Sequence, residues 1–432
     1  MTDLWPAQQR AITELADKPR ALLIAPMGAG KTRVALAASA DASRIIVIAP
    51  YAAACDTWPH EVSRWTDRQP VNVAGEPTAA RRLEAIARAE HGDALILNYE
   101  ALRTSKILHA ICRIYGASLI VDEAHRVATP SSRNLWHTHW LAKRASRVTL
   151  MTGTPFITSR GRLALWSYQA ACGAPSEMTH AMYRQRYTEP TWRRGEADGS
   201  YYNGRAVQYY RYARDHEWHE ELDRIAVHMP LDAAADRPSC VTVDVRAAMI
   251  STTARVFRHL AVHHTYPDGL AVPHTLARHT ALRQIPAYDR AMRVHPILED
   301  RDGRVVVFYT YRREADCAAE LSEQPVYRLD GSANDVPAWR GDPRGVLFVQ
   351  YQAGAEGLDL TDARIVVLMS PTTNAVLHDQ AIARVHRPGQ TRAVVVYQVT
   401  VDGSLDSVIQ SAVQRRIDVH EAIAQYTASL EA

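Results

Sequence analysis

The stretch that decides the fold runs Ala21-Leu22-Leu23-Ile24-Ala25-Pro26-Met27-Gly28-Ala29-Gly30-Lys31-Thr32. A short apolar run enters a loop of small residues, and a helix-forming segment, residues 33–38, follows directly. A strand, a glycine-containing loop and a helix in this order let backbone N–H groups turn inward around phosphates. The stretch therefore predicts a phosphate-binding loop at the end of a buried strand. The alternative is a tight turn that precedes a helix by chance.

Two side chains of this loop carry the expected chemistry. Lys31 would reach the β- and γ-phosphates of a nucleotide, and Thr32 would bind Mg²⁺. Ala25 replaces the first glycine of the strict pattern G-x-x-x-x-G-K-[ST]. The other residues that we expect to contact the nucleotide here are Gly28, Ala29 and Gly30.

An acidic pair follows a second buried run. Leu119-Ile120-Val121 ends in Asp122-Glu123. Acids at the exit of a strand suit metal binding and water activation, so Asp122 would hold Mg²⁺ and Glu123 would orient and deprotonate the attacking water. A solvated acidic helix cap is the alternative for an isolated pair of this kind.

The order of apolar runs predicts an α/β fold with two parallel-sheet lobes. Buried strands are expected at 21–25, 44–49, 94–97, 119–121 and 148–151, and then at 305–309, 345–349, 365–369 and 394–399. Between these sets the apolar runs thin out. We therefore divide the chain into a first lobe, residues 1–165, a mostly helical insertion, residues 166–290, and a second lobe, residues 291–432.

Composition excludes several classes of protein. The chain has 432 residues, 47% of them apolar and 22% charged, which argues against wholesale disorder and fibrous architecture. The net charge of +3 excludes a histone-like basic protein, but it leaves open an enzyme whose positive charge is local. Five scattered cysteines argue against a disulfide framework or a cysteine-based zinc site.

The chain has no apolar stretch of about 18 residues, the length that a membrane helix needs. Its first residues lack the basic and apolar regions of a signal peptide. We therefore expect no membrane partner and a cytoplasmic protein, located in a bacterium or in the host of a phage.

With these motifs in place, the chain resembles the superfamily 2 helicase-like ATPases, and specifically the Snf2 family of DNA translocases. Leu4-Trp5-Pro6-Ala7-Gln8 is similar to the adenine-reading Q motif, with Gln8 as the reader. Asp122–His125 resembles the DEAH box, and Met151-Thr152-Gly153-Thr154-Pro155 resembles the motif that couples ATP turnover to movement. The resemblance implies two RecA-like lobes. It also implies coupling roles for His125, Thr152 and Thr154.

The second lobe carries the most specific resemblance, Gln380-Ala381-Ile382-Ala383-Arg384-Val385-His386-Arg387-Pro388-Gly389-Gln390. Arg384 and Arg387 are three positions apart, so on a helix both would point the same way and reach a γ-phosphate. A salt-bridged surface helix is the alternative. The resemblance adds further ATP contacts at Gln380, Gly357 and Asp359, although many Snf2 proteins carry Asn at the last position.

Candidate DNA contacts come from two sources. By resemblance they lie near Thr154 and Ala353 and at Tyr51, Tyr99 and Tyr311. In addition, residues 183–214 hold seven arginines against three acids, together with eight aromatic residues, and Asn203-Gly204 predicts a hairpin turn. The residues that we expect to face DNA there are Arg193, Arg194, Tyr201, Tyr202 and Arg205. The alternative is a folded helical insertion with its tyrosines packed on its own lobe.

The resemblance implies an ATP-dependent translocase on double-stranded DNA that hydrolyses ATP to ADP and phosphate with Mg²⁺. Closure of the lobes around ATP would drive it, and it would act on double-stranded or branched DNA as a monomer, in replication, recombination or repair. One alternative is a helicase that separates strands or migrates branches at forks and junctions. Another is a nucleotide-gated DNA-binding subunit of a larger defence or repair complex.

Overall fold

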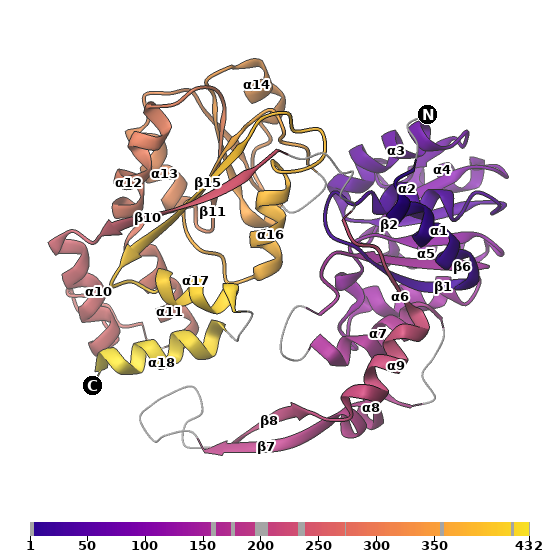
Figure 1. The fold of residues 1–432 in the computed structure, drawn as a ribbon, viewed down its shortest axis with the longest axis horizontal. Coiled ribbons are helices and arrows are strands. Elements are labelled where there is room, and N and C mark those ends of the chain that lie inside the picture. The colour runs from indigo at the N-terminus through magenta and orange to yellow at the C-terminus, as the bar shows by residue number, and fades with distance from the viewer. Residues whose placement is uncertain are drawn as a thin grey trace. The chain divides into compact units, whose positions relative to one another are not determined.

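The structure is a computed structural model, and it describes residues 4–156, 161–173, 178–194, 206–231, 238–272, 274–354, 358–415 and 419–431. The chain divides into two compact units, and Figure 1 labels the helices and strands from which they are built. Unit 1 comprises residues 1–191, 209–235 and 356–358, and unit 2 comprises residues 192–208, 236–355 and 359–432. The predicted insertion, residues 166–290, is thus shared between the two units.

Unit 1 is built on a seven-stranded parallel sheet in the order β3-β4-β2-β5-β6-β1-β9. The bounds are β1 Arg20–Ile24, β2 Ile45–Ala49, β3 Pro70–Asn72, β4 Ala94–Asn98, β5 Ser118–Val121, β6 Arg147–Thr152 and β9 Ala226–His228. The five predicted strands are present. Strands β3 and β9 were not predicted, because three residues are too few to make an apolar run.

Helices cover both faces of this sheet because its strands alternate their side chains between two cores. In β4, Leu95 and Leu97 belong to one core, and Ala94 and Ile96 belong to the other. The second core also holds α1 Pro6–Asp17, α2 Lys31–Ala37 and α3 Trp58–Trp65, with the helical turn η1 Ala53–Thr57. The first core holds α4 Ala79–Arg88, α5 Ser105–Cys112, α6 Arg133–Ala142, α7 Ala164–Ala171, α8 His180–Tyr187 and α9 Asp215–Ile225, with the turns η2 Ala101–Arg103, η3 Ala124–Val127 and η4 Gly161–Leu163.

A two-stranded sheet links α8 to α9. It pairs β7 Thr188–Arg194 with β8 Ala206–Tyr212, and the Ala213 N–H donates to the Tyr187 carbonyl at 2.9 Å just outside it. The structure thus contains the strands of a hairpin in this segment. The predicted Asn203-Gly204 turn lies outside the described residues.

Unit 2 is built on a six-stranded parallel sheet in the order β10-β15-β14-β11-β13-β12. The bounds are β10 Cys240–Ala248, β11 Val305–Tyr309, β12 Val326–Leu329, β13 Val346–Gln350, β14 Ile365–Leu368 and β15 Val394–Asp402. The four predicted strands are present, so the prediction of two parallel-sheet lobes is confirmed. Strand β10 was not predicted, and it pairs with β15 along its whole length.

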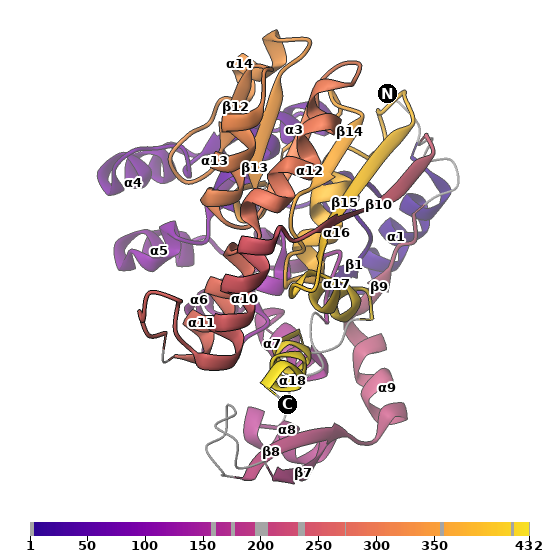
Figure 2. The same ribbon diagram turned by 90° about the vertical axis from the view of Figure 1, so that its left-hand side faces the viewer.

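The helices of unit 2 are α10 Ser251–His263, α11 Thr275–Gln284, α12 Ala287–Glu299, α13 Arg312–Leu321, α14 Val336–Gly341, α15 Tyr351–Gly354, α16 Ala375–Ala383, α17 Asp406–Gln414 and α18 Val419–Glu431. Of these, α12 and α13 pack in one apolar core with the sheet, and α10, α11, α17 and α18 pack in another. Figure 2 shows α12 and α13 beside the sheet, and α10, α11, α17 and α18 together near its end. Among the described residues, no helix is long and apolar enough to cross a membrane.

A buried charge cluster joins the helices of unit 2 to its last strand. Arg290 on α12 is 1% exposed, and it donates to Glu314 on α13 at 2.7 Å and to Asp406 on α17 at 2.9 Å. Asp406 also accepts from the Val401 N–H of β15 at 3.1 Å. Burial alone would lower the pKa of Arg290, but the two carboxylates raise it. One cation therefore holds three helices and a strand together.

Replacing Arg290 by Met should remove most of the stability of unit 2, because it leaves two carboxylates buried without their cation. We expect a loss of about 3–5 kcal/mol in the free energy of unfolding, measured by urea denaturation of the full chain. The control is Arg293→Met on the exposed side of the same helix, which should change stability little. Equal losses in the two variants would contradict the structural role of Arg290.

Candidate nucleotide-binding site

The phosphate loop of unit 1 has the backbone that its sequence predicts. Gly28 and Gly30 lie in the left-handed region, with φ of 78° and 82°, and α2 begins at Lys31. The Lys31 ammonium donates to the carbonyls of Ala25 at 2.9 Å and Pro26 at 3.1 Å. These bonds hold the cation over the loop, where phosphate oxygens could replace the carbonyls. A compact ammonium suits this position.

Gln8 supports the loop from α1. Its side-chain amide donates to the Ala29 carbonyl at 3.0 Å, and its oxygen accepts from the Trp5 N–H at 3.1 Å. A Cβ added to Gly30 would lie 2.3 Å from the Gln8 Nε2 atom. Gln8 is therefore buried against the loop with both ends of its amide engaged. Its predicted contact with adenine stays a prediction.

The acidic pair leaves β5 in a tight turn. Asp122 accepts from the Trp58 indole N–H at 3.0 Å and from the Glu123 N–H at 2.9 Å. Burial and the Glu123 carboxylate together raise the pKa of Asp122 to about 6, although the Trp58 hydrogen bond and the Lys31 charge oppose them. Glu123 has a φ of 49°, which is rare for a residue with a side chain and typical of functional turns. The two carboxylates are thus close together, and the backbone strain lies at Glu123.

Two neighbours hold this turn in place. The Nδ1 atom of His125 lies 3.2 Å from a Glu123 carboxylate oxygen, and the Tyr99 hydroxyl donates to the Asp122 carbonyl at 2.6 Å. Tyr99 is only 1% exposed. We therefore correct the expectation that this side chain contacts DNA, because its ring is enclosed by protein and its hydroxyl is used to position the acidic turn.

The coupling motif lies directly against the phosphate loop. The Ala25 N–H donates to the Thr152 carbonyl at 3.1 Å, and the Thr154 N–H donates to the Thr152 hydroxyl at 3.1 Å. A Cβ added to Gly153 would lie 3.8 Å from the Lys31 ammonium. A shift of the Lys31 ammonium toward a phosphate would thus change its contact with residues 152–154.

The donor set of this site suits Mg²⁺. The ion prefers carboxylate and hydroxyl oxygens together with phosphates, and Thr32 and Asp122 offer both kinds of side-chain oxygen. Burial and the neighbouring Glu123 carboxylate raise the pKa of Asp122, and a divalent cation beside it would oppose both effects. Glu123, beside it, could then act on water.

In unit 2, the two predicted arginines lie beyond the end of a helix rather than on it. Helix α16 ends at Ala383, Arg384 is its C-cap, and Arg387 follows in an irregular turn, so the expectation of a shared helix face is wrong. Arg384 is 6% exposed and donates to the Gly354 carbonyl at 3.2 Å, whereas a guanidinium nitrogen of Arg387 lies 3.8 Å from an Asp359 carboxylate oxygen. The helix does not continue through Arg387 because Pro388 and Gly389 follow, and neither residue favours a helix interior.

The structure nevertheless brings these residues to one place in unit 2. The Leu360 N–H donates to the Arg384 carbonyl at 3.0 Å, and Asp359 accepts from the Thr361 hydroxyl at 2.7 Å. Gln390 fastens the same turn by donating to the Ala363 carbonyl at 2.8 Å. The role of Gln390 was not predicted, because its partners lie far away in sequence. Gln380 is buried in α16, and Gly357 lies outside the described residues.

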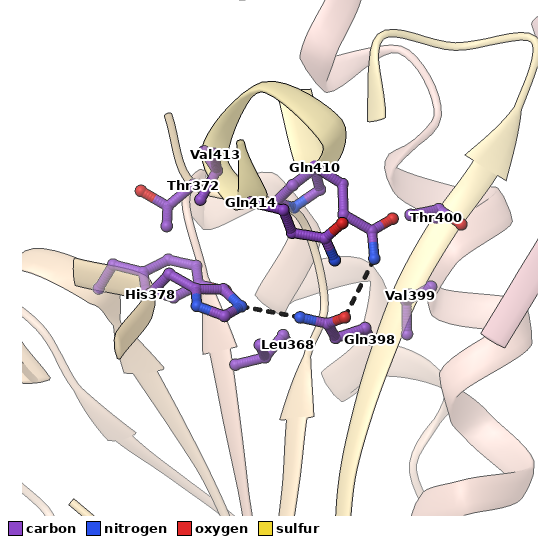
Figure 3. Close-up of a pocket in the computed structure, with 11 residues that line it drawn as sticks. Leu368, Thr372, His378, Gln398, Val399, Thr400, Gln410, Val413 and Gln414 are labelled. Atoms are coloured by element: carbon purple, nitrogen blue, oxygen red, sulfur yellow. Dashed lines mark hydrogen bonds between the residues drawn. The ribbon is translucent and has the colours of Figure 1, made fainter. Parts of the chain in front are cut away.

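A chain of amides anchors α16 to its neighbours, around the pocket drawn in Figure 3. Gln398 on β15 contacts the His378 ring on α16 at 2.8 Å, and Gln410 on α17 donates to Gln398 at 3.0 Å. Leu368, Val399 and Val413 line the same pocket. The helix that leads to Arg384 is thus held by two elements.

The other candidate DNA contacts have mixed surroundings. Tyr51 is 52% exposed, and its hydrogen bond with Cys55 raises its pKa. Tyr311 precedes α13, and the Arg283 guanidinium lies 5.1 Å from the centre of its ring. Arg193 and Arg194 end β7. Tyr201, Tyr202 and Arg205 lie outside the described residues.

Comparison with known proteins adds two family matches and several relatives. Residues 5–160 match the DEAD/DEAH box helicase family, and residues 288–389 match the Helicase conserved C-terminal domain. The chromatin-remodeling ATPases INO80 of Candida glabrata and Saccharomyces cerevisiae are each 28% identical over 136 residues, which cover 29% of this chain and 9% of the relative. The chain therefore spans about a tenth of the length of these relatives.

Two solved structures align over most of the chain. The Sulfolobus solfataricus SWI2/SNF2 ATPase core in complex with dsDNA is 16% identical, with a TM-score of 0.43 and coverage of 99% of this chain and 95% of that one. The same core domain alone is 18% identical, with a TM-score of 0.44 and coverage of 96% and 89%.

The DEAD/DEAH box helicase match thus lies on unit 1, and the match to the Helicase conserved C-terminal domain lies almost entirely on unit 2.

Adding a methyl group at Gly30 should measure how Gln8 supports the phosphate loop. Gly30→Ala should lower the free energy of unfolding by about 2–3 kcal/mol, because it strains φ and displaces two hydrogen bonds of Gln8. Gly92→Ala is the matched control, since Gly92 has a φ of 99° and open space around it, and should cost only about 1 kcal/mol. In a Gln8→Ala background the two glycine substitutions should cost the same, and a cost at Gly30 that persists there would contradict the contact. Urea denaturation provides the measurement, with binding of a fluorescent ATP analogue as a second readout.

The raised pKa of Asp122 makes stability depend on pH. A folded-state pKa near 6, above the ordinary value of 3.8, means that the free energy of unfolding falls as pH rises through this interval. Asp122→Asn removes this loss. The free energy of unfolding of the variant should therefore rise relative to that of the wild type between pH 4 and pH 7, by up to about 3 kcal/mol. Urea denaturation across this range measures the difference, and exposed Asp17→Asn is the control. A wild-type to variant difference that does not change with pH would contradict the shift.

Proposed function

We propose that this chain is an ATP hydrolase whose turnover drives translocation along double-stranded DNA. The observation that carries the proposal is the meeting of three motifs at one edge of the unit 1 sheet. Lys31 of the phosphate loop lies within charge range of Asp122, and Gly153 of the coupling motif lies against the same ammonium. A phosphate-binding cation, a metal-binding acid and a segment in contact with that cation are parts that an ATP-driven motor requires.

Each part has a role in hydrolysis. Lys31 would bind the β- and γ-phosphates, and the loop N–H groups would bind their oxygens. Thr32 and Asp122 would hold Mg²⁺, which neutralises phosphate charge when bound. Glu123, held beside His125, would orient the attacking water and take its proton. Trp58 and Tyr99 would keep the acidic turn in position.

Arginines of unit 2 would complete the reaction. Arg384 and Arg387 would contact the γ-phosphate, as arginine fingers do in other phosphoryl-transfer enzymes. Asp359 would then release its ion pair with Arg387 and contact the ribose of the nucleotide instead. Since the required groups belong to two units, ATP would favour a closed arrangement and hydrolysis would release it.

DNA is the partner that best suits this machinery. The relatives are named chromatin-remodeling ATPases, and the exposed Tyr51 side chain lies just after β2, at the same edge as the phosphate loop. A grip on the phosphate backbone would be independent of sequence and sensitive to salt. The strands β7 and β8 favour a second candidate, a helicase that separates or migrates strands, since a projecting hairpin can divide a duplex.

The rate of phosphate release should separate these functions. We expect double-stranded DNA to stimulate the full chain more than single-stranded DNA does, and RNA to have little effect. Glu123→Gln should bind ATP like the wild type and hydrolyse it at least 10²-fold more slowly, because the base is lost while its shape is kept. Stimulation by RNA alone would overturn the choice of DNA, and near-normal turnover by Glu123→Gln would remove that residue from its role. Preferential stimulation by a four-way junction, with strand displacement, would select the second candidate.

A further inference from the structure

Helix α6 carries an exposed stripe that the nucleotide site does not use. Arg133, Trp136, Trp140 and Lys143 follow one another at intervals of three, four and three positions, which places them along one face of a helix. All four are exposed, with Trp136 at 39% and Trp140 at 46%. The stripe spans about 15 Å, with a cation at each end and two indole rings between.

The opposite face of α6 explains its stability without these residues. Leu135 and Leu141 are buried in the core of unit 1, and His139 is buried with its ring bonded to the Ala170 carbonyl at 2.7 Å. The contacts of α6 with the buried core therefore come from this opposite face, and Trp136 and Trp140 lie outside that core. Large apolar rings that are left in water beside such a core usually mark a contact surface.

Further cations surround the stripe. Arg103 in η2 and Lys106 on α5 are exposed, and α6 packs against both elements. Burial lowers the pKa of His137, and the charges of Arg133 and Arg103 lower it further, which places both guanidinium groups near this ring. In the described part of the chain, Arg103, Lys106, Arg133 and Lys143 form no ion pair with a carboxylate.

The local charge is strongly one-sided. Residues 101–145 contain seven Lys and Arg residues but only two acids, and both acids are the Asp122-Glu123 pair of the nucleotide site. Half of the four lysines of the chain, Lys106 and Lys143, lie in this short segment. A surface of this kind attracts a polyanion, and an acidic partner that is not a polymer would leave most of the cations unused.

The tryptophans have the orientation of fixed platforms. The Trp136 indole N–H donates to the Pro130 carbonyl at 3.1 Å, and its ring packs edge-on against Trp166 of α7, with centroids 6.4 Å apart. Trp140 is flanked by His137 at 6.0 Å. Figure 2 shows α6 and α7 as neighbours, in agreement with their contacts. A ring held on one side and open on the other can stack on a flat ligand at low entropic cost.

We propose that the α5–α6 face, defined by Arg103, Lys106, Arg133, Trp136, Trp140 and Lys143, binds single-stranded nucleic acid. The cations would contact phosphates, and the two indoles would stack on successive bases. A duplex is a poorer occupant because its bases are already paired and stacked, so it offers no free ring to Trp136 or Trp140. This surface is separate from the nucleotide site, and binding at it does not depend on ATP turnover.

The test uses the full chain and a fluorescein-labelled oligothymidylate, with binding followed by anisotropy. The double variant Trp136→Ala/Trp140→Ala should bind this probe about 10- to 100-fold more weakly, because each base stack that it loses is worth about 1–3 kcal/mol. The matched control is Tyr288→Ala/Met292→Ala, a second exposed pair four positions apart on a helix, which should bind like the wild type. An oligouridylate of the same length distinguishes RNA from DNA as the single strand.

A charge variant tests the phosphate contacts separately. Arg103→Gln/Arg133→Gln/Lys143→Gln should reduce the slope of log affinity against log salt by about 2, whereas the tryptophan variant should keep the wild-type slope. Both variants should retain basal and duplex-stimulated ATP hydrolysis. Unchanged affinity of the tryptophan variant for the oligonucleotide would overturn the proposal and leave the face to a protein partner. Loss of duplex stimulation with normal oligonucleotide binding would overturn it as well, and would place the face on the duplex track instead.

Discussion

The parallel pairing of β1 with β6 is the constraint on which the nucleotide site depends. The register joins Arg20 to Val148 and Ile24 to Thr152, and it continues as the Ala25 N–H bond to the Thr152 carbonyl. Because β5 pairs with the other side of β6, the acidic turn leaves the sheet at the same edge. A slip of one residue would turn every side chain of β1 to the wrong core and pull the phosphate loop away from the coupling motif. Strand register, rather than any contact of the loop itself, therefore positions the chemistry.

Buried carboxylates in the two units follow opposite rules. Glu314 and Asp406 are almost fully buried, but Arg290 and several backbone N–H groups satisfy them, so they stabilise the fold. Asp122 is held by an indole and one N–H, beside a second acid, and its pKa is raised. A carboxylate whose negative charge is already balanced by a cation and hydrogen bonds gains little by binding a further cation. The incomplete compensation of Asp122 is thus what separates a binding site from a structural cluster.

The sequence was most informative where a pattern is local. Nine buried strands could be predicted because the strands of a parallel sheet covered on both faces have continuous apolar sequences. Strand β10 was missed although Val241, Val243 and Val245 alternate with polar residues, since an edge strand exposes one face and resembles a loop. The phosphate loop could be placed residue by residue, whereas the bond from Trp58 to Asp122 joins positions 64 apart in the chain. The turn at Arg384 was read as helix because spacing alone does not show where a helix ends.

The net charge of +3 hides how the cations of this chain are used. Many arginines donate hydrogen bonds to backbone carbonyl groups where helices, strands and loops meet. Arg20 donates to the Ala142 carbonyl at 3.0 Å, and Arg68 donates to the Gly92 carbonyl at 3.0 Å. Their planar forks suit such contacts, and a guanidinium engaged in this way adds little to the attraction of a distant anion. The field outside the protein is set by the cations that remain exposed and unpaired. For that reason the distribution of unpaired charge, and not its sum, indicates where an anionic polymer would first contact the molecule.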